Sequence, residues 1–429
     1  MLHGRLATPL LVALLAAACA TPSARPPVPA PAPTPVVRMP EEVRALWVVR
    51  FTLAHPDSVR AMVQRADEAG FNTLIVQVRG RGDAFYDGTW EPRADALADQ
   101  PADFDPLELV IEEAHRRGIA VHAWVNTHLI ANMDQLPKAE DHIVYRRPDL
   151  VAVPQPLARE LYDADPFAPG YVDRILEYAR NNRSHIEGLY TIPSSPEVKE
   201  HVYSIWMDVL ERYDVDGIHF DYVRYPAPDH DYSRTALDRF RRWLEPQLDD
   251  AVRERFSALA DADPLAYTDS FPEEWDRFRR AQITDLVERI YHGVKQRKPD
   301  VLVSAAVFAN SEDAYTRRYQ DWREWLRRGI LDIAAPMAYS VETSVFEEQI
   351  RTAVETAGGE RVWAGIGSWR NTVDGTVEKI EVARDLDAAG IVLFSYDAAV
   401  RPSETNPDGD FLLRVRDRAF RGALTSTEQ

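Results

Sequence analysis

Eight short apolar runs, separated by longer stretches with helical spacing, set the main constraint on the fold. The runs are rich in β-branched and aromatic residues, which favours buried strands. Between them apolar residues recur every three or four positions, as expected of amphipathic helices. This alternation predicts a parallel α/β fold, and eight units predict a closed (β/α)8 TIM barrel with long insertions in its βα loops. The runs span residues 44–51, 72–78, 119–126, 217–225, 301–310, 332–340, 363–369 and 390–397.

An open, doubly wound sheet is the alternative arrangement of the same units. Such sheets bind dinucleotides through a glycine-rich loop after the first strand. Here Arg50-Phe51-Thr52-Leu53 follows the first run, so the dinucleotide interpretation lacks its physical basis. We therefore predict a barrel over residues 41–400, followed by a C-terminal helix and tail over residues 401–429.

The first 40 residues differ in character from the rest. Arg5, an apolar run at residues 9–15 and three alanines are typical of a secretory signal peptide over residues 1–18. Cys19, the single cysteine, follows as in a bacterial lipobox, and prolines alternate through the linker at residues 19–40. We expect a lipid on Cys19 and a location in the bacterial cell envelope, at the outer membrane facing the periplasm. Ordinary cleavage with an unmodified cysteine is the alternative.

The composition narrows the range of partners. A formal net charge of −19 argues against nucleic acid and against an anionic membrane surface, because phosphate groups bind to basic faces. The 10 tryptophans and 17 tyrosines supply rings on which the C–H faces of sugars stack. We expect a polysaccharide partner, no nucleic acid, and no membrane contact except through the N-terminal lipid.

Polar and aromatic side chains gather where the predicted strands end. The carboxyl ends of barrel strands meet at one face, so residues from different strands converge there. Two long connections, residues 128–216 and 226–300, would deepen that face into a groove. The residues expected to contact substrate are Arg79, Asp83, Tyr86, His122, Trp124, Asn126, His219, Arg224, Tyr225, Asn310, Tyr339, Trp369 and Tyr396.

Two aspartates of the fourth run have different expected roles. Five extended residues cover roughly 16 Å, so Asp216 and Asp221 lie at opposite ends of one strand. We expect Asp216 to hydrogen-bond to structure at the bottom of the barrel. Asp221 is expected at the mouth, in an open cleft shared with Asn126, Tyr339 and Tyr396.

The string DGIHFDYVRYP at residues 216–226 resembles the glycosyl hydrolase-like 10 family of bacterial lipoproteins. HAWVN at residues 122–126, PMAY at 336–339 and FSY at 394–396 support a resemblance that extends over residues 43–400. The family implies a barrel distantly similar to retaining α-glycosidases, and some members are associated with cleavage of peptidoglycan glycan strands stripped of peptides. By position, the resemblance implies that Asp221 is the nucleophile.

The second carboxyl group is where the chain departs from this pattern. Related glycosidases often place an acid/base glutamate at the end of the fifth strand, but this strand ends at Asn310. A retaining mechanism needs its carboxyl groups about 5 Å apart, and an inverting one about 6.5 to 9.5 Å. The candidate partners of Asp221, in falling order, are Glu312, Asp397, Asp83 and Glu342.

Three functions are compatible with these residues. In glycoside hydrolysis, Asp221 attacks or stabilises the anomeric carbon, a second carboxyl group protonates the leaving oxygen, and no cofactor or metal takes part. Arg224 would orient Asp221 and keep it ionised. A non-catalytic glycan-binding lipoprotein is the alternative, and it explains the missing glutamate. A metal-dependent hydrolase using His122, His219 and Asp221 is the third, although their spacing matches no metal motif.

Overall fold

The computed structural model describes residue 1 and residues 42–403, 406 and 408–420. Residues 2–18 of the predicted signal peptide, Cys19 with its predicted lipid, and the predicted linker up to residue 40 lie outside these residues. Within the described part of the chain, no helix has the length and apolar character needed to cross a membrane.

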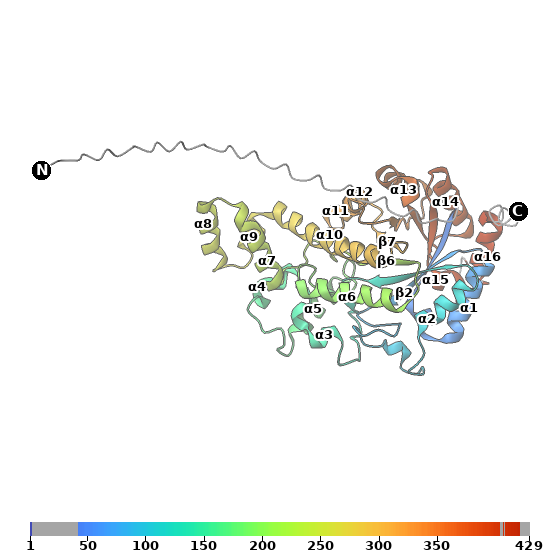
Figure 1. The fold of residues 1–429 in the computed structure, drawn as a ribbon, viewed down its shortest axis with the longest axis horizontal. Coiled ribbons are helices and arrows are strands. Elements are labelled where there is room, and N and C mark those ends of the chain that lie inside the picture. The colour runs from blue at the N-terminus through green and yellow to red at the C-terminus, as the bar shows by residue number, and fades with distance from the viewer. Residues whose placement is uncertain (2–41, 404–405, 407, 421–429) are drawn as a thin grey trace. The chain divides into compact units, whose positions relative to one another are not determined.

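Eight parallel strands form one sheet, in the order β8-β7-β6-β3-β2-β1-β10-β9. Isolated bridges from Ala334 to Val362 and from Met337 to Gly365 join the two edge strands and all but close the sheet into a barrel, which helices surround (Figure 1). The prediction of a (β/α)8 barrel is confirmed. The strands are β1 (Val43–Val48), β2 (Thr73–Arg79), β3 (Ala120–Asn126), β6 (Gly217–Asp221), β7 (Leu302–Val307), β8 (Ile333–Pro336), β9 (Trp363–Gly367) and β10 (Gly390–Phe394).

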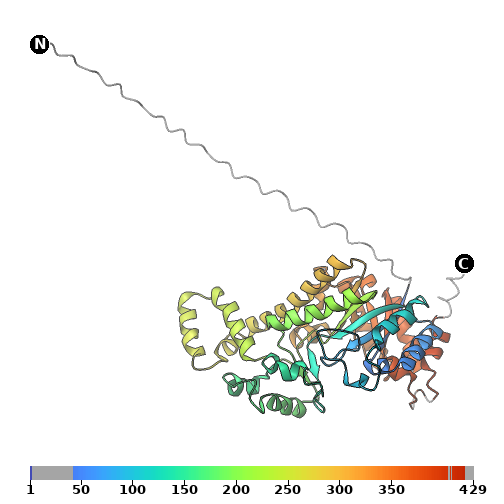
Figure 2. The ribbon, with the colours of Figure 1, turned by 60° about the horizontal axis from the view of Figure 1, so that its bottom comes forward.

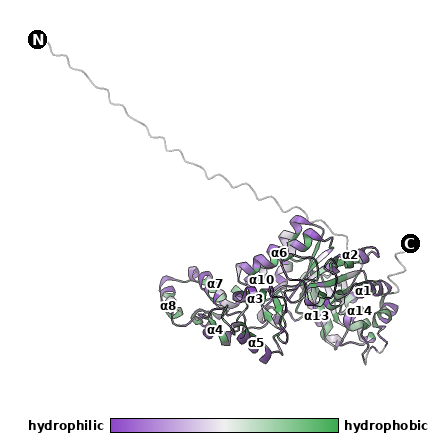
Figure 3. Ribbon diagram, turned by 90° about the horizontal axis from the view of Figure 1, so that it is seen from below, coloured by the Kyte–Doolittle hydropathy of each residue, from purple (hydrophilic) through white to green (hydrophobic). Residues whose placement is uncertain are grey.

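Every barrel strand is followed by at least one helix. α6 and α10 run side by side along the outside of the barrel (Figure 2), where Lys199 donates to Gln282 Oε1 at 3.0 Å. The outer helices carry both hydrophilic and hydrophobic residues, as expected of helices with one buried face (Figure 3). These helices are α1 (Pro56–Glu68), α2 (Pro106–His115), α6 (Pro196–Arg212), α10 (Pro272–Arg297), α11 (Ser311–Thr316), α12 (Trp322–Arg327), α13 (Thr343–Ala357), α14 (Val373–Asp385), α15 (Tyr396–Val400) and α16 (Phe411–Val415).

Two insertions interrupt the repeat, as the long connections predict. The first, between β3 and α6, contains a small antiparallel sheet of β4 (Leu129–Ala131) and β5 (Leu189–Tyr190). The second, between β6 and α10, packs against the start of α10 in an aromatic cluster that includes Phe240 and Trp275. The inserted helices are α3 (Ile143–Arg146), α4 (Gln155–Leu161), α5 (Tyr171–Asn181), α7 (Arg234–Leu244), α8 (Asp250–Ala260) and α9 (Ala266–Ser270). Short helical turns are η1 (Arg50–Ala54), η2 (Asp95–Leu97), η3 (Pro148–Leu150), η4 (Glu245–Gln247), η5 (Gly359–Arg361) and η6 (Arg416–Phe420).

Alternate residues of neighbouring strands stack in layers inside the barrel. In the register of β3 and β6, His122 lies beside Gly217, Trp124 beside His219, and Asn126 beside Asp221. These pairs mark the bottom, middle and top of the interior. β6 stops at Asp221 because Tyr222 adopts a φ of 49°, which ends an extended strand. The predicted run to residue 225 was therefore too long.

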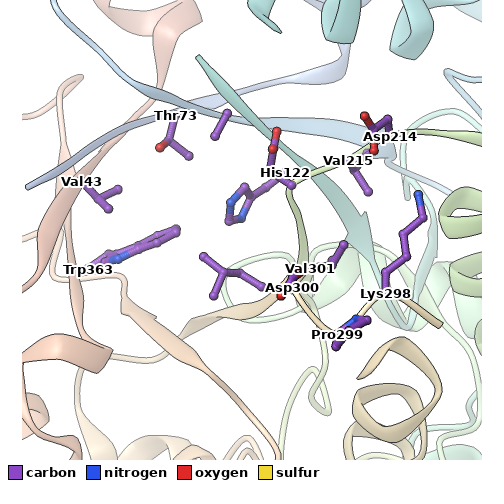
Figure 4. A pocket seen from close by; sticks show the side chains of 13 residues that line it. Val43, Thr73, His122, Asp214, Val215, Lys298, Pro299, Asp300, Val301 and Trp363 are labelled. Carbon is purple, nitrogen blue, oxygen red and sulfur yellow. The ribbon is translucent and has the colours of Figure 1, made fainter. Parts of the chain in front are cut away.

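The bottom of the barrel contains a cavity of about 540 Å³. His122 and Trp363 line it (Figure 4), with ring centroids 5.4 Å apart. Nearby, Asp216 accepts a hydrogen bond from the Val121 N–H at 2.8 Å and pairs with His115 Nε2 at 2.8 Å. The structural role predicted for Asp216 is confirmed.

Candidate active site

Asp221 ends β6 at the mouth of the barrel. The Tyr222 N–H donates to Asp221 Oδ1 at 2.7 Å, and no other residue that the structure describes hydrogen-bonds to the carboxylate. The residue is 8% exposed. Burial raises the pKa of the Asp221 carboxyl to about 6, because it outweighs the opposing charge of Arg224. Asp221 is thus mostly ionised at neutral pH and takes up a proton in mildly acidic solution.

Arg224 binds a second carboxylate rather than Asp221. Its Nη2 donates to Glu187 Oε1 at 3.0 Å and its Nη1 to the Tyr190 hydroxyl at 3.3 Å, while the guanidinium lies 4.4 Å from the centre of the Tyr222 ring. The expectation that Arg224 orients Asp221 directly is therefore wrong. Arg224 acts on Asp221 through its charge, and the groups it orients are Glu187 and Tyr190.

Glu187 is the functional candidate that sequence reasoning missed. Burial alone would raise the pKa of its carboxyl, but Arg224 and the Tyr190 hydroxyl outweigh burial and lower that pKa. The Glu187 side chain is still 36% exposed, and its charge contributes to the raised pKa of Asp221. Two carboxyl groups with oppositely shifted pKa values therefore lie in one electrostatic environment.

The backbone explains how Glu187 reaches the mouth. The chain after β3 pairs with the end of β6, where the Thr127 N–H donates to the Asp221 carbonyl at 2.7 Å. The same segment pairs with β5, where the Thr191 N–H donates to the His128 carbonyl at 2.8 Å. Glu187 precedes β5 by two residues, and no local motif marks it.

An aromatic surface adjoins Asp221 on the other side. Tyr339 packs edge-on against Trp369 at 4.9 Å and stacks on Phe394 at 5.6 Å between ring centroids. The pKa of Tyr339 is raised by burial and by the charge of Asp221, so its hydroxyl lies in the field of that carboxylate. Trp369 is 46% exposed. Trp369 thus presents an exposed indole next to Tyr339, the tyrosine in the field of Asp221, and such a ring suits the apolar face of a sugar.

Arg79 and Asn126 are fully buried at the ends of β2 and β3, and neighbouring residues occupy their hydrogen-bonding groups. Arg79 is fully buried, pairs with Glu91 Oε1 at 2.6 Å, and donates to the Asn126 carbonyl. Asn126 accepts hydrogen bonds on Oδ1 from Gln77 at 3.2 Å and from Trp124 at 2.9 Å. Their hydrogen bonds tie together the ends of β2 and β3, and Trp124 is part of the same buried network.

The two histidines are core residues at different levels. His219 Nε2 accepts from the Trp47 indole at 3.0 Å, and His219 Nδ1 bonds to Ser304 Oγ at 2.9 Å. His122 lies at the bottom cavity, and burial lowers the pKa of both rings. Since His122, His219 and Asp221 occupy three successive layers, they do not converge on one metal ion. Metal binding through this trio is contradicted.

Three predicted tyrosines also serve packing. Tyr86 lies edge-on to Tyr213, with ring centroids 6.0 Å apart, and Tyr225 lies edge-on to Tyr319 at 5.3 Å. Both are buried, as is Tyr396. An open cleft that Asp221 shares with Asn126 is therefore wrong, because Asn126 pairs with Asp221 in the sheet but its side chain is fully buried. Tyr339 is the predicted companion whose hydroxyl lies in the field of the Asp221 carboxylate.

The predicted partner carboxylates lie in other settings. Glu312 is exposed on α11, whose N-terminus Asn310 caps by accepting from the Glu312 N–H at 3.1 Å. Both oxygens of Asp397 accept from the chain after β1, one from the Val49 N–H at 2.9 Å and one from the Thr52 hydroxyl. Asp83 accepts from the Arg81 N–H at 2.7 Å. Glu342 is exposed before α13. These contacts favour Glu187 over all four.

Solved structures with a similar fold include a glycoside hydrolase domain and a beta-amylase domain. The glycoside hydrolase domain of PgaB (BpsB) from Bordetella bronchiseptica matches 89% of this chain and 100% of its own length, with a TM-score of 0.59 and 15% identity. The catalytic domain of beta-amylase from Paenibacillus polymyxa matches 88% of this chain and 99% of its own length, with a TM-score of 0.55 and 10% identity. At these identities the likeness establishes the barrel fold alone.

Curated relatives are more similar in sequence. Glycosyl hydrolase YngK of Bacillus subtilis (strain 168) is 25% identical over 330 residues, covering 70% of this chain and 54% of the relative. Glycosyl hydrolase DigH of Escherichia coli (strain K12) is 27% identical over 300 residues, covering 65% and 58%. The chain thus spans little more than half the length of these relatives. Because the model of the glycosyl hydrolase-like 10 family matches residues 42–362, which include Asp221, Glu187 and Tyr339, this chain belongs to that family.

Proposed function

We propose that this chain hydrolyses a glycosidic bond of a cell-envelope polysaccharide, with Asp221 as the nucleophile or stabilising carboxylate. The observation that carries the proposal is the setting of Asp221 at the mouth. One of its oxygens is held by the Tyr222 N–H, and the other has no hydrogen bond from any residue in the described part of the chain. An ionised carboxylate with one uncommitted oxygen can attack an anomeric carbon or stabilise its developing positive charge.

Glu187 is proposed as the second carboxyl group, in the role of a general base, because Arg224 and Tyr190 lower its pKa and keep it ionised. Arg224 and Tyr190 hold it in place, and its side chain reaches solvent at the mouth. Trp369 would stack on a sugar ring bound between these groups. Peptidoglycan glycan strands stripped of peptides are the proposed substrate, on the strength of the family resemblance; the names of the curated relatives support glycoside hydrolysis alone.

The proposal is tested by incubating the purified protein with peptide-free glycan strands and measuring new reducing ends. Asp221→Asn and Glu187→Gln should each lower turnover, by roughly 100-fold or more. Azide should restore turnover to Asp221→Ala if Asp221 is the nucleophile, because a small anion then replaces the missing carboxylate. If glycan binds but no reducing ends appear, the non-catalytic binding function is correct instead.

We also propose that the protein is anchored in the cell envelope by a lipid on Cys19, on the strength of the sequence of residues 1–40. Cys19→Ala should move the protein from the membrane fraction to the soluble fraction. Retention of Cys19→Ala in the membrane fraction would refute this anchor.

A further inference from the structure

A second cavity adjoins the mouth, and its lining is basic although the chain is acidic overall. It measures about 370 Å³ and lies between the loops that follow β1 and β2 and the start of the first insertion. Four cationic residues face two acidic ones in a protein with a net charge of −19. The charged lining residues are Arg50, Arg81, Arg93, Lys138, Asp83 and Asp95.

The acidic residues of this cavity are already engaged by backbone groups. Asp83 Oδ1 accepts from the N–H groups of Gly80 and Arg81 at 3.2 and 2.7 Å. Asp95 accepts from the Lys138 N–H at 3.0 Å. Arg93 donates to the carbonyls of Phe104 and Pro101, both at 3.1 Å. The Lys138 side chain is exposed to solvent, so Arg50 and Arg81 are the half-buried cations left to consider.

Neither Arg50 nor Arg81 forms an ion pair with any described residue. Arg50 Nη1 donates to the neutral amide of Gln77 at 3.0 Å, and Arg81 Nη1 donates to the Gly80 carbonyl at 3.0 Å. Arg81 Nε is buried without a hydrogen-bond partner in the described part of the chain. By contrast, Arg79 in the same segment is paired with Glu91. The half-buried guanidinium groups of Arg50 and Arg81 therefore have N–H groups left to donate to a ligand.

The local fold holds these two groups together. A Cβ on Gly80 would lie 2.3 Å from Arg50 Cδ, so the absence of a side chain at residue 80 lets Arg50 cross the end of β2. His142 Nε2 bonds to the Arg81 carbonyl at 2.7 Å and fixes the adjacent loop. Burial and the neighbouring Arg81 charge lower the pKa of Arg50 to about 10. An anion between the two guanidinium groups would relieve their repulsion.

Charge effects connect this cavity to Asp221. The charge of Arg81 acts on Asp221, and both arginines lie in the field of Tyr222, the residue after it. Beside them, the Phe51 ring lies 4.4 Å from the Arg50 guanidinium and is 62% exposed. A ring that can stack on a sugar thus accompanies a cationic pair near the proposed scissile bond.

We propose that Arg50 and Arg81 form a subsite for a carboxylate carried by a sugar of the substrate, next to the ring bound at Asp221. The proposal rests on the proposed glycoside hydrolysis. Guanidinium groups bind carboxylates through paired charge-assisted hydrogen bonds. The substrate class is therefore a glycan whose sugars bear carboxylates, as a uronic acid or as an acidic ether, and not a neutral glycan.

The experiment compares two forms of one substrate. Peptide-free glycan strands are used as isolated and after reduction of their carboxyl groups to alcohols, and kcat/KM is measured on both. The wild-type chain should prefer the carboxylate form by about 10- to 100-fold. Arg50→Gln and Arg81→Gln should each remove most of that preference, whereas Arg81→Lys, which keeps the charge but loses the planar fork, should keep part of it.

Arg289→Gln is the matched control. Arg289 lies on α10 and pairs with Glu200 at 2.5 Å, so its substitution makes the same charge change on the outer surface of the barrel. The preference of this variant should equal that of the wild type. Melting temperatures of all variants show which of them fold.

The two proposals fail in different ways. Equal cleavage of both substrate forms by the wild type would overturn the subsite while leaving glycoside hydrolysis intact. If neither form is cleaved, hydrolysis fails, and the subsite is then judged by binding of the carboxylate form, measured by calorimetry. If the carboxylate form binds more weakly to the Arg81→Gln variant than to the Arg289→Gln variant, the subsite is supported. Equal affinity of the two variants for this form would overturn the subsite.

Discussion

Two buried aspartates, Asp221 at the barrel mouth and Asp231 in the second insertion, have the same raised pKa of about 6 but different surroundings. Asp231 accepts three hydrogen bonds, from the Val153 N–H at 2.9 Å, the Ser233 N–H at 2.8 Å and the Ser233 hydroxyl at 3.0 Å. Asp221 accepts one. Burial is the largest cause of the raised pKa at both positions.

The contrast shows that a raised pKa does not by itself identify a catalytic carboxylate. Asp231 has both oxygens engaged and orders the chain that starts α7. Asp221 keeps one oxygen uncommitted and lies in the field of Arg224, Glu187 and Arg81. Asp221 and Asp231 are thus distinguished by the hydrogen-bonding capacity left on the carboxylate and by the charges nearby, more than by burial.

The largest expected difference between the two aspartates is in turnover. Asp221→Asn should lower kcat by roughly 100-fold or more, because it removes a charge needed in the transition state. Asp231→Asn should keep near wild-type kcat. Release of reducing ends from glycan strands measures both, and similar losses in the two variants would remove the distinction drawn here.

The next difference concerns stability. Folded Asp221 titrates at about pH 6 and an unfolded aspartate near pH 4, so the folded state binds the extra proton between these values. Stability therefore falls as pH rises through that window. Asp221→Asn should raise the free energy of unfolding by at most roughly 3 kcal/mol at about pH 8 and leave it nearly unchanged at about pH 3.5.

Asp231→Asn should raise the free energy of unfolding by less than Asp221→Asn does at about pH 8. The reason is that an asparagine amide at residue 231 cannot accept hydrogen bonds from both Ser233 groups and from Val153 at once. Urea unfolding of the wild type and both variants at the two pH values makes the comparison. A larger rise in the free energy of unfolding for Asp231→Asn than for Asp221→Asn would contradict this prediction.

The exposed ring beside Asp221 has no counterpart in the described surroundings of Asp231. Trp369→Ala should raise KM roughly tenfold by removing a stacking surface. Trp90, which is 48% exposed and packs against His201, provides the control, since Trp90→Ala should leave KM unchanged. Initial-rate kinetics on glycan strands distinguish the two variants.

The smallest expected effect tests the second carboxyl group. Tyr190 donates to Glu187 at 2.7 Å and lowers its pKa, so Tyr190→Phe should raise that pKa. The limb of the kcat/KM pH profile that belongs to Glu187 should move to higher pH by at most about one pH unit. Tyr178→Phe, which removes the hydroxyl that donates to Asp229, should leave the profile in place.

The barrel was predictable because its signal is local and repeated. Each strand buries a continuous apolar run, and all eight runs became strands. The separation of Asp216 from Asp221 followed from strand length alone. Several predicted strands extend beyond the observed carboxyl ends. The residues after Asp221, Val307 and Pro336 leave the sheet and form the mouth instead.

The site was less predictable because alternation along a strand gives the direction of a side chain but not its height in the barrel. His122, His219 and Asp221 all point inward, yet only Asp221 lies at the mouth. Glu187 could not be found from the sequence, because it reaches the mouth through pairing between segments far apart in the chain. Glu312 was favoured through its closeness to the fifth strand, although its side chain is exposed on α11.

The seam between β8 and β9 has a consequence for access. Isolated bridges join these two strands, whereas continuous ladders join every other neighbouring pair of barrel strands described, so the wall yields most easily there. Tyr339 and Trp369 follow these two strands. Breathing at the seam would widen the entrance above Asp221, while β6, tied on both sides, keeps the carboxylate still. The weaker seam and the support of Asp221 thus belong to different parts of one wall, which would suit the proposed function.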